Sequence, residues 1–440
     1  MRVLFAASEL TPIAKVGGLG DVIGALPKAE AKLGVEAEVV IPFYEVVRSG
    51  NWKPERMFSL DERTAVWRTF IPNSTIPVYL IENDEFLSQG PVYFEKTAFV
   101  GTQKEIDRFT FFSKTVATLI DRGFFKPDIV HANDWHTGAL VSMLEGKKVN
   151  TIFTIHNLAN QGTAGGRNLM AEGIRGADFI TTVSPTYAKE ILTSEYGEGL
   201  DEILRSRQKN LKGILNGIDY EFWNPAEDAF LFKQYTKETV REGKAENKKA
   251  VLQSFGLEGG APLFGLVARL TSQKGIDFIT DSIPLFFEKY DARFVCLGQG
   301  APIYETALKR LAERFPDRVQ VRFGFNEELA HRIYAGSDFF LMPSRFEPCG
   351  LGQMIAMRYG TIPIVRSTGG LKDSVKQRKT GFVFKAASAK SFRSGLQTAM
   401  HVYEQNISNF ETMRIRAMEE NFDFEVSAKA YIKLYRTLLE

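Results

Sequence analysis

The sequence is poor in cysteine and almost balanced in charge. It has 440 residues but only two cysteines, Cys296 and Cys349, which argues against a disulfide scaffold and favours a reducing compartment. The 55 Lys and Arg residues are offset by 53 Asp and Glu residues, so the net charge is +2. Such a chain has no bulk attraction for nucleic acid or for an anionic membrane. Any anion must therefore be bound by a few local cations.

Long hydrophobic runs are also missing. The N-terminal stretch MRVLFAASEL has only about five consecutive apolar residues before Ser8 and Glu9, too few for the apolar region of a signal peptide. No later apolar run reaches the length that is needed to cross a bilayer. We therefore expect a cytoplasmic protein.

What the sequence does contain is a regular alternation of short apolar runs with segments of helical length. The runs are 3–8, 37–42, 77–82, 128–133, 151–156 and 179–184 in the first half, and 263–269, 293–298, 319–324, 339–344, 361–366 and 381–385 in the second. Apolar strands that alternate with helices predict parallel sheets covered on both faces. Two such series predict two doubly wound α/β domains. The turn-rich stretch ILNGIDYEFWNP ends the first series, so we place the first domain at 1–220 and the start of the second at 221.

Polar residues gather at the predicted strand ends of the first half, where open parallel sheets bind ligands. KVGGLGDV (15–22) is neither a P-loop nor a G-x-G-x-x-G motif. Its glycines would let backbone N–H groups approach an anion beside Lys15, although a simple turn explains them equally well. HANDWH (131–136) has His131, Asp134 and His136 with metal-ligand side chains, but hydrogen bonds to sugar hydroxyls beside a stacking Trp135 explain the motif better.

Three further strand ends carry candidate residues. TIHNLANQG (154–162) places His156 and Asn157 together, a pair that favours a ligand role over a core histidine. VARLTSQKG (267–275) offers Arg269 and Lys274, which could grip a diphosphate or lie on a solvated surface. FEPCGLGQM (346–354) sets Glu347 beside a predicted helix start whose amides could bind phosphate. A carboxylate there needs a cationic partner, and a developing oxocarbenium ion would be one.

Taken together and in order, these motifs resemble the bacterial glycogen synthases and plant starch synthases over nearly the whole chain. The motifs are KVGGLGDVIGALPKA, HANDWHTGAL, TIHNLANQG, ITTVSPTYAKEI, GILNGIDYEFWNP, ARLTSQKGID, GSDFFLMPSRFEPCGLGQM and RSTGGLKDSV. The resemblance implies two Rossmann-like domains that face each other across a cleft, the GT-B architecture. It also implies that a helical segment, 416–440, crosses back to the first domain, so that the second domain is 221–415.

The activity implied by the resemblance is transfer of glucose from a nucleotide sugar, usually ADP-glucose, with retention of configuration. The acceptor would be the non-reducing end of an α-1,4-glucan such as glycogen, starch or a maltooligosaccharide. No metal or other cofactor is expected, nor a nucleic-acid or membrane partner. A plant-type enzyme of this kind would work in the plastid stroma instead of the cytoplasm.

The resemblance also assigns roles to individual residues. In the first domain, the residues implied to bind the donor or the acceptor are Lys15, Gly17, Gly18 and Asp21 for the donor, Asp134, His156 and Asn216 for the glucose, and Trp135, His136 and Asn157 toward the acceptor. In the second domain, they are Arg269 and Lys274 for the diphosphate, Glu347 beside the anomeric carbon, Cys349, Gly350 and Leu351 around the glucose and phosphate, and Phe325 against the base. Glu347, His156, Arg269 and Lys274 would be the catalytic group.

The chemistry agrees with these roles. Cleavage of the glucose–phosphate bond builds negative charge on the diphosphate and positive charge on the sugar, which cations and a carboxylate respectively stabilise. Retaining glycosidases use two carboxylates, and Glu347 has no evident second one, so attack from the face of departure is favoured. Ile355 stands where many other GT-B transferases carry a second Glu, which argues against a sucrose-synthase-like or mannosyltransferase activity.

The chain departs from the family pattern at two places. The segment 163–178 is shortened and has Ala171 where relatives have Lys, and Ala301 replaces a common acidic residue. Two alternatives therefore stay open: a related retaining glucosyltransferase with another donor or acceptor, and a non-catalytic glucan-binding relative. Phe325 would stack on adenine or uracil, so ADP-glucose and UDP-glucose are both compatible with the sequence. The sequence indicates neither the oligomeric state nor the regulation of the protein.

Overall fold

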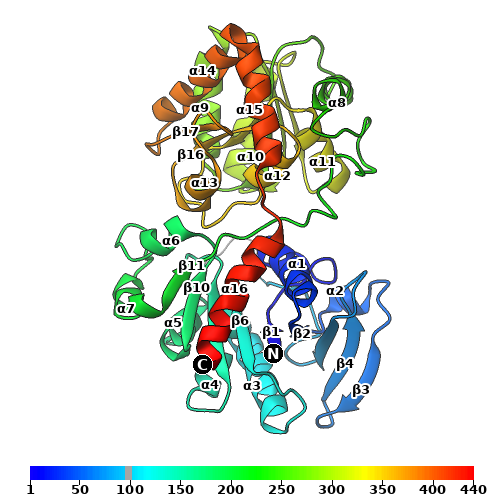
Figure 1. Ribbon diagram of the computed structural model, residues 1–440, viewed down its shortest axis with the longest axis vertical. Coiled ribbons are helices and arrows are strands. Elements are labelled where there is room, and N and C mark those ends of the chain that lie inside the picture. Colours follow the sequence, from blue (N-terminus) through cyan, green and yellow to red (C-terminus); the bar gives the residue numbers. More distant parts are fainter. Residues whose placement is uncertain (95–101) are drawn as a thin grey trace. The chain divides into compact units, whose positions relative to one another are not determined.

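The computed structural model describes residues 1–94 and 102–440 and divides the chain into two compact units (Figure 1). Unit 1 is Met1–Ile218 with Asp423–Glu440, and unit 2 is Asp219–Phe422. The chain therefore changes unit at 218/219 and 422/423, not at the expected 220/221 and 415/416. Helix α15 (Ile407–Glu419) stays with unit 2 because Phe410 packs on Phe339 of the unit 2 sheet, with ring centroids 5.2 Å apart.

Unit 1 is built on one mixed sheet with the strand order β11-β10-β7-β6-β1-β2-β5-β4-β3. The parallel strands are β1 (Arg2–Ala6), β2 (Glu36–Pro42), β5 (Pro77–Asn83), β6 (Ile129–Asn133), β7 (Asn150–Ile155), β10 (Phe179–Thr182) and β11 (Leu211–Gly213). The antiparallel strands β3 (Glu55–Ser59) and β4 (Thr64–Phe70) extend one edge and were not predicted. The strand order reverses direction between β1 and β6, which is where ligands bind in doubly wound sheets.

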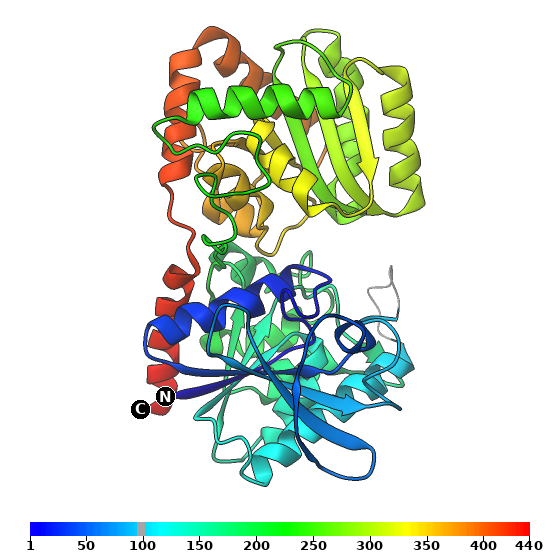
Figure 2. The ribbon, with the colours of Figure 1, turned by 90° about the vertical axis from the view of Figure 1, so that its right-hand side faces the viewer.

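Helices cover both faces of the unit 1 sheet. They are α1 (Gly18–Lys32), α2 (Glu45–Arg48), α3 (Gln103–Asp121), α4 (Gly138–Leu144), α5 (Leu169–Gly176), α6 (Pro185–Glu190), α7 (Asp201–Ser206) and α16 (Phe424–Leu439). Alternate β1 side chains enter different cores, as the pleat of a strand requires. Val3 and Phe5 pack with α1 and α16, which lie side by side in Figures 1 and 2, whereas Leu4 packs with α3 and α4.

A buried chain of polar groups ties α16 to the sheet. Tyr435 donates its hydroxyl proton to Glu30 Oε1 on α1 at 2.9 Å, and its oxygen lies 2.8 Å from Nδ1 of His131. The other ring nitrogen of His131 is 2.6 Å from Thr154 Oγ1. Burial lowers the pKa of His131 to about 3, so the ring is neutral. His131 is thus a core residue with a structural partner on each side.

Unit 2 has an all-parallel sheet in the order β14-β13-β12-β15-β16-β17. Its strands are β12 (Leu263–Leu270), β13 (Arg293–Gly300), β14 (Val319–Phe323), β15 (Phe339–Met342), β16 (Ile362–Arg366) and β17 (Phe382–Phe384). Numbered within the unit, this is the Rossmann order 3-2-1-4-5-6, with its switch point between β12 and β15. The six strands correspond to the six apolar runs of the second half, so the prediction of a doubly wound domain is confirmed.

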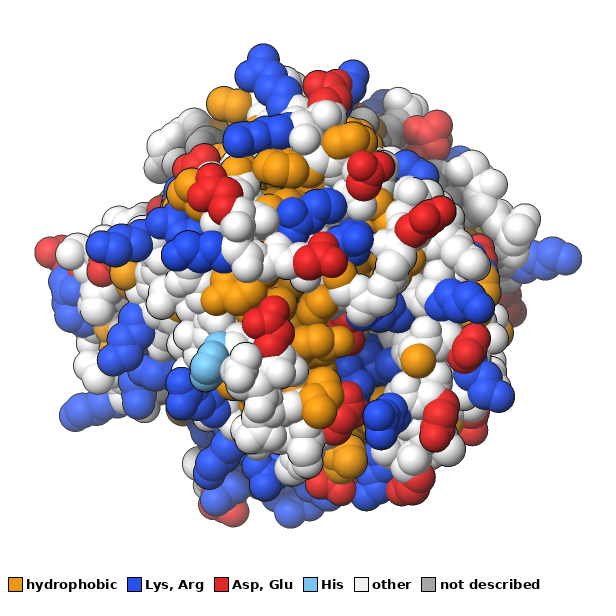
Figure 3. Space-filling view, turned by 90° about the horizontal axis from the view of Figure 1, so that it is seen from above, with side chains coloured by type: hydrophobic (Ala, Val, Ile, Leu, Met, Phe, Trp, Pro, Cys, Tyr) orange, Lys and Arg blue, Asp and Glu red, His pale blue; other side chains and the backbone are white. Residues whose placement is uncertain are grey.

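The remaining helices of unit 2 cover this sheet. They are α8 (Val240–Ser254), α9 (Ile276–Phe287), α10 (Pro302–Arg314), α11 (Glu327–Gly336), α12 (Gly352–Arg358), α13 (Gly369–Ser374) and α14 (Ala389–Gln405). On the surface shown in Figure 3, basic and acidic side chains are interspersed, in keeping with the small net charge. Among the described residues, every helix is too short or too polar to span a membrane.

Candidate active site

The switch point of unit 2 brings together two residues from separate motifs. Lys274 lies in the 3₁₀ turn after β12, and Glu347 lies in the loop after β15. The Nζ of Lys274 is 2.6 Å from Glu347 Oε2, and the Ser344 hydroxyl donates to the same oxygen at 2.9 Å. Glu347 is only 5 % exposed. A carboxylate so deeply buried requires a cation and a hydrogen bond, and here it has both.

Glycines allow the chain to close around this ion pair. Gly275 has φ +66°, and a Cβ there would lie 2.3 Å from the carbonyl oxygen of Pro343. Gly369 has φ +43°, and a Cβ there would lie 1.9 Å from the carbonyl oxygen of Glu347. The N–H of Gly370 donates to that same carbonyl oxygen at 3.1 Å. The motif RSTGGLKDSV therefore supports the backbone of Glu347, a role that its sequence alone did not reveal.

Two arginines hold the loop that contains Glu347 in place. Arg345 makes a bidentate ion pair with Asp277 on α9, with oxygen distances of 2.8 and 2.6 Å. Arg366, at the end of β16, donates to the carbonyl oxygen of Ser344 at 2.8 Å and to that of Arg345. Neither arginine was predicted, because a sequence pattern discloses neither the distant Asp277 carboxylate nor the backbone carbonyls that accept from Arg366.

The other predicted residues of unit 2 lie near the same ends of its strands. Arg269 is exposed near the end of β12, and Phe325 is 76 % exposed after β14. Cys349 is buried, while Gly350 (φ +73°) and Leu351 lead into α12. The unit therefore combines an exposed cation, an exposed aromatic ring and a buried ion pair along one edge of its sheet.

In unit 1, Asp134 follows β6 at the β1/β6 switch point, and His156 follows the neighbouring strand β7. Asp134 follows β6 with φ 57°, a left-handed backbone that is uncommon for a residue with a Cβ. Its Oδ1 accepts the backbone N–H of His156 at 2.7 Å and that of Asn157 at 3.4 Å. Burial raises the pKa of Asp134 to about 7. The carboxylate therefore fixes the backbone at the end of β7.

The imidazole of His156 is held as a neutral ring. Its Nε2 is 3.0 Å from Oδ1 of Asn133, and burial lowers the pKa of His156 to about 3. The structure thus brings Asp134 and His156 together, as the resemblance implied. A neutral imidazole can donate one hydrogen bond and accept another, which suits recognition of a hydroxyl-rich ligand.

Trp135 and His136 are placed differently from the expectation. Trp135 is 6 % exposed, and its ring lies against Gly162, where a Cβ would come within 2.0 Å of it. His136 is enclosed by rings, with centroid distances of 4.6 Å to Phe109 and 5.1 Å to Tyr93. The interpretation of Trp135 as a ring that stacks on a sugar is therefore wrong in this structure, because neighbouring residues cover the indole ring. Nor do His131, Asp134 and His136 converge, because each has its own partners.

The glycine-rich turn is organised by Glu9, a residue that the sequence did not single out. Its Oε2 accepts the backbone N–H groups of Val16 at 2.8 Å and Gly17 at 2.6 Å. Lys15 pairs with Asp21 at 2.7 Å. Within the described residues, no group of three or more His, Cys, Asp or Glu side chains is arranged as a metal site.

The shortened segment 163–178 forms a small hairpin, β8 (Thr163–Ala164) with β9 (Arg167–Asn168), followed by α5. Ala171 is buried in the first turn of α5, so a lysine at this position would place its stem in the core. Arg167 makes a bidentate pair with Glu172 at 2.9 and 2.7 Å. Asn216, also predicted, is buried after β11.

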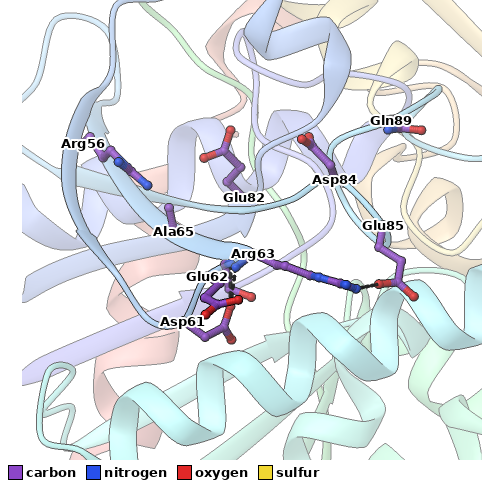
Figure 4. A pocket seen from close by; sticks show the side chains of 10 residues that line it. Arg56, Asp61, Glu62, Arg63, Ala65, Glu82, Asp84, Glu85 and Gln89 are labelled. Carbon is purple, nitrogen blue, oxygen red and sulfur yellow. Dashed lines mark hydrogen bonds and ion pairs between the residues drawn. The ribbon is translucent and has the colours of Figure 1, made fainter.

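A separate pocket opens at the β3–β4–β5 edge of unit 1 (Figure 4). Its charged side chains include the pair Arg63–Glu85, 3.1 Å apart, and Glu82, which accepts from the Trp67 indole at 2.7 Å. None of the predicted site residues lines this pocket. In each unit, the candidate residues lie at the carboxyl ends of its strands and not at this pocket.

Comparison with known proteins covers both units. Residues 2–206 match the family model described as starch synthase catalytic domain, and residues 247–409 match that of glycosyl transferases group 1. The chain is 40 % identical to the glycogen synthase of Gloeobacter violaceus, covering 100 % of this chain and 99 % of that one. It is also 40 % identical to glycogen synthase 1 of Synechocystis sp., covering 99 % and 95 %.

Solved structures give the same picture. The catalytic domain of starch synthase IV from Arabidopsis thaliana, bound to ADP and acarbose, is similar to this chain with a TM-score of 0.88 and 32 % identity. The similarity covers 100 % of this chain and 99 % of that one. Sucrose-phosphate synthase from Thermosynechococcus elongatus shares the fold with a TM-score of 0.67 and 17 % identity, covering 99 % and 98 %.

Proposed function

Because this chain belongs to the family of glycogen and starch synthases, we propose that it transfers glucose from ADP-glucose to an α-1,4-glucan. Membership of this family makes it a retaining glycosyltransferase of the GT-B fold. The observation that carries the proposal is the buried Lys274–Glu347 ion pair at the switch point of unit 2. ADP as the donor nucleotide is supported by the starch synthase IV structure, whose ligand is ADP.

In the proposed mechanism, Lys274 and Glu347 interact with different parts of the donor once it binds. The Lys274 ammonium would also interact with the diphosphate, and the exposed Arg269 would add a second, bidentate contact to it. Glu347 would face the anomeric carbon and stabilise the positive charge that develops there. Both effects act on the same bond, since departure of the diphosphate creates both charges at once. Phe325 would stack on the base, and Cys349, Gly350 and Leu351 would line the glucose and phosphate positions.

Unit 1 would contribute sugar recognition and a further cation. Asp134 and His156 would bind hydroxyl groups of the transferred glucose, with Asn216 as a further contact. Lys15, Asp21 and the Gly17–Gly18 turn would contact the donor, and Asn157 would lie toward the acceptor. Trp135 and His136 would act on the acceptor side only by supporting these neighbours, because both are buried.

Retention would follow from attack on the face from which the diphosphate leaves. The acceptor hydroxyl forms the new bond to the anomeric carbon, the glucose–phosphate bond breaks, and a phosphate oxygen of the leaving group takes the hydroxyl proton. No covalent glucosyl-enzyme is formed on this route. Trapping a glucosyl adduct on a side chain during turnover would contradict it.

A direct assay tests the proposal. The protein is incubated with maltooligosaccharides and either ADP-glucose or UDP-glucose, and nucleotide release, chain length and the anomeric configuration of the new linkage are measured. We expect α-linked growth that is faster with ADP-glucose. Growth with UDP-glucose alone would reject the donor, whereas nucleotide release without growth would point to another acceptor. Absence of both reactions with both donors would reject the enzyme assignment.

The activity should also depend on the ionisation of Asp134. Its carboxylate form accepts hydrogen bonds from the N–H groups of His156 and Asn157, and its pKa is raised to about 7 by burial. Protonation below that pH weakens these bonds, so kcat/KM for ADP-glucose should fall by about tenfold per pH unit below the pKa. Asp134→Asn should lower the rate and flatten this acid limb. A wild-type profile that is flat between about pH 5.5 and 7.5, the range around and below the pKa of Asp134, would contradict the prediction.

A further inference from the structure

The glycine-rich turn of unit 1 is closed by a carboxylate that the proposed mechanism does not use. Glu9 is 4 % exposed, and both of its oxygens are engaged. Oε2 accepts from the backbone N–H groups of Val16 and Gly17, while Oε1 accepts from the Tyr93 hydroxyl at 2.7 Å. The Gly17 amide therefore points at an internal anion. This corrects the expectation that this amide would be offered to an external one.

The segment leading to Lys15 is closed on itself. Leu10 and Ala14 exchange two backbone hydrogen bonds of 2.9 and 2.7 Å, so the residues between them form a closed loop. Thr11 Oγ1 donates to Oδ1 of Asp21 at 3.2 Å, and the Lys15 ammonium reaches the same oxygen at 2.7 Å. Lys15 thus leaves a fixed loop on one side and enters the turn bonded to Glu9 on the other.

The glycines of α1 serve this packing. A Cβ at Gly20 would lie 3.2 Å from Glu9 Oε2, and one at Gly24 would lie 2.7 Å from the carbonyl oxygen of Thr11. Both contacts are closer than a side chain allows without movement of its neighbours. The pattern GGLGDVIG therefore lets α1 approach the Glu9 segment. Gly20 and Gly24 are therefore needed by the packing of the protein itself, independently of any ligand.

We propose that Glu9 is a positioning residue for the nucleotide sugar, acting through the segment Lys15–Gly17. This inference rests on the proposed function and deepens it. In this proposal Glu9 does not contact the substrate: its carboxylate accepts the backbone N–H groups of Val16 and Gly17, and it so fixes the direction in which Lys15 leaves the loop. A cation that is held in place before the donor arrives loses less freedom on binding, which lowers the KM for the donor.

Two substitutions separate this role from a general effect on folding. Glu9→Ala removes the acceptor, so we expect the KM for ADP-glucose to rise at least about tenfold while the KM for maltooligosaccharide stays within about threefold. Glu9→Gln keeps an oxygen for both amides and an N–H₂ group for the Tyr93 oxygen. It should therefore restore the donor KM to within about threefold of wild type. Equal rises in both KM values, or a Gln variant as impaired as the Ala variant, would overturn the proposal.

A matched control is available on α1, the helix that packs against the Glu9 segment. Glu30, near the C-terminal end of α1, is also a buried glutamate, and its Oε1 accepts from Tyr435. Glu30→Ala should lower thermal stability while leaving the donor KM within about threefold. In addition, Glu9→Ala should add little to the loss caused by Lys15→Ala, because both act on one contact. Fully additive losses would contradict action through Lys15.

A measurement without substrate keeps this inference distinct from the proposed function. Amide hydrogen exchange at Val16 and Gly17 should be slow in the wild type and in Glu9→Gln, and at least about tenfold faster in Glu9→Ala. If the exchange rates do not differ, Glu9 does not hold the turn, whatever the enzyme transfers. If the rates differ as expected but no donor supports transfer by the wild type, the proposed function fails while the structural role of Glu9 stands. The assignment of Glu9 to donor positioning would then be overturned.

Discussion

Replacing Glu347 by alanine should lower the rate of glucose transfer by about a thousandfold and leave ADP binding almost unchanged. The carboxylate is buried at the switch point of unit 2, where Lys274 and Ser344 hold its Oε2. Its proposed task, stabilising positive charge on the sugar, exists only in the transition state. The loss should therefore appear in kcat, measured by nucleotide release at saturating donor, and not in the Kd for ADP, measured by calorimetry.

Glu347→Gln sharpens this test, because it keeps the size of the side chain and an oxygen for Ser344 and removes only the charge. We expect a loss within about tenfold of that in the alanine variant, since the charge is the catalytic property. Glu411→Gln is the control: Glu411 is a partly buried, ion-paired carboxylate of unit 2 whose partner is Arg414. That variant should keep turnover within about twofold. A Glu347→Gln enzyme with nearly full activity would remove Glu347 from the proposed mechanism.

The sequence predicted the parts of the site that depend on where strands end. Lys274 and Glu347 belong to motifs more than seventy positions apart, yet each follows a strand that borders the switch point, so their meeting could be anticipated. Asp134 and His156 meet in unit 1 because they follow the neighbouring parallel strands β6 and β7. In both units, residues that are far apart in the sequence lie close together because the strands that they follow are neighbours in the sheet.

What the sequence did not predict depends on tertiary contacts of the backbone. Glu9 acts on the N–H groups of Val16 and Gly17, and Gly369 is required by the carbonyl oxygen of Glu347; no spacing rule refers to such partners. Trp135 was misinterpreted because an aromatic residue beside polar ones has the same composition in a core as on a binding surface. The change of unit after Phe422 was placed too early because α15 and α16 form one nearly continuous helical pattern.

Lys274→Ala should harm both catalysis and stability, and the two effects should be separable. Without Lys274 the buried Glu347 carboxylate keeps, among the residues that the structure describes, the Ser344 hydrogen bond alone, which should reduce the free energy of unfolding by about 3 kcal/mol in urea titration of the enzyme. Adding Glu347→Gln removes the unpaired charge, so the double variant should regain most of this loss.

Turnover responds differently, because it requires Lys274 for the diphosphate and Glu347 for the sugar, each of which the double variant lacks. We expect a loss of at least about a thousandfold in Lys274→Ala and in the double variant alike. Recovery of stability without recovery of activity would show that the Lys274–Glu347 ion pair has two roles. It stabilises the fold when no donor is bound, and its two side chains act in catalysis when the donor is bound. A double variant no more stable than Lys274→Ala would mean that the pair is not coupled as its 2.6 Å separation requires.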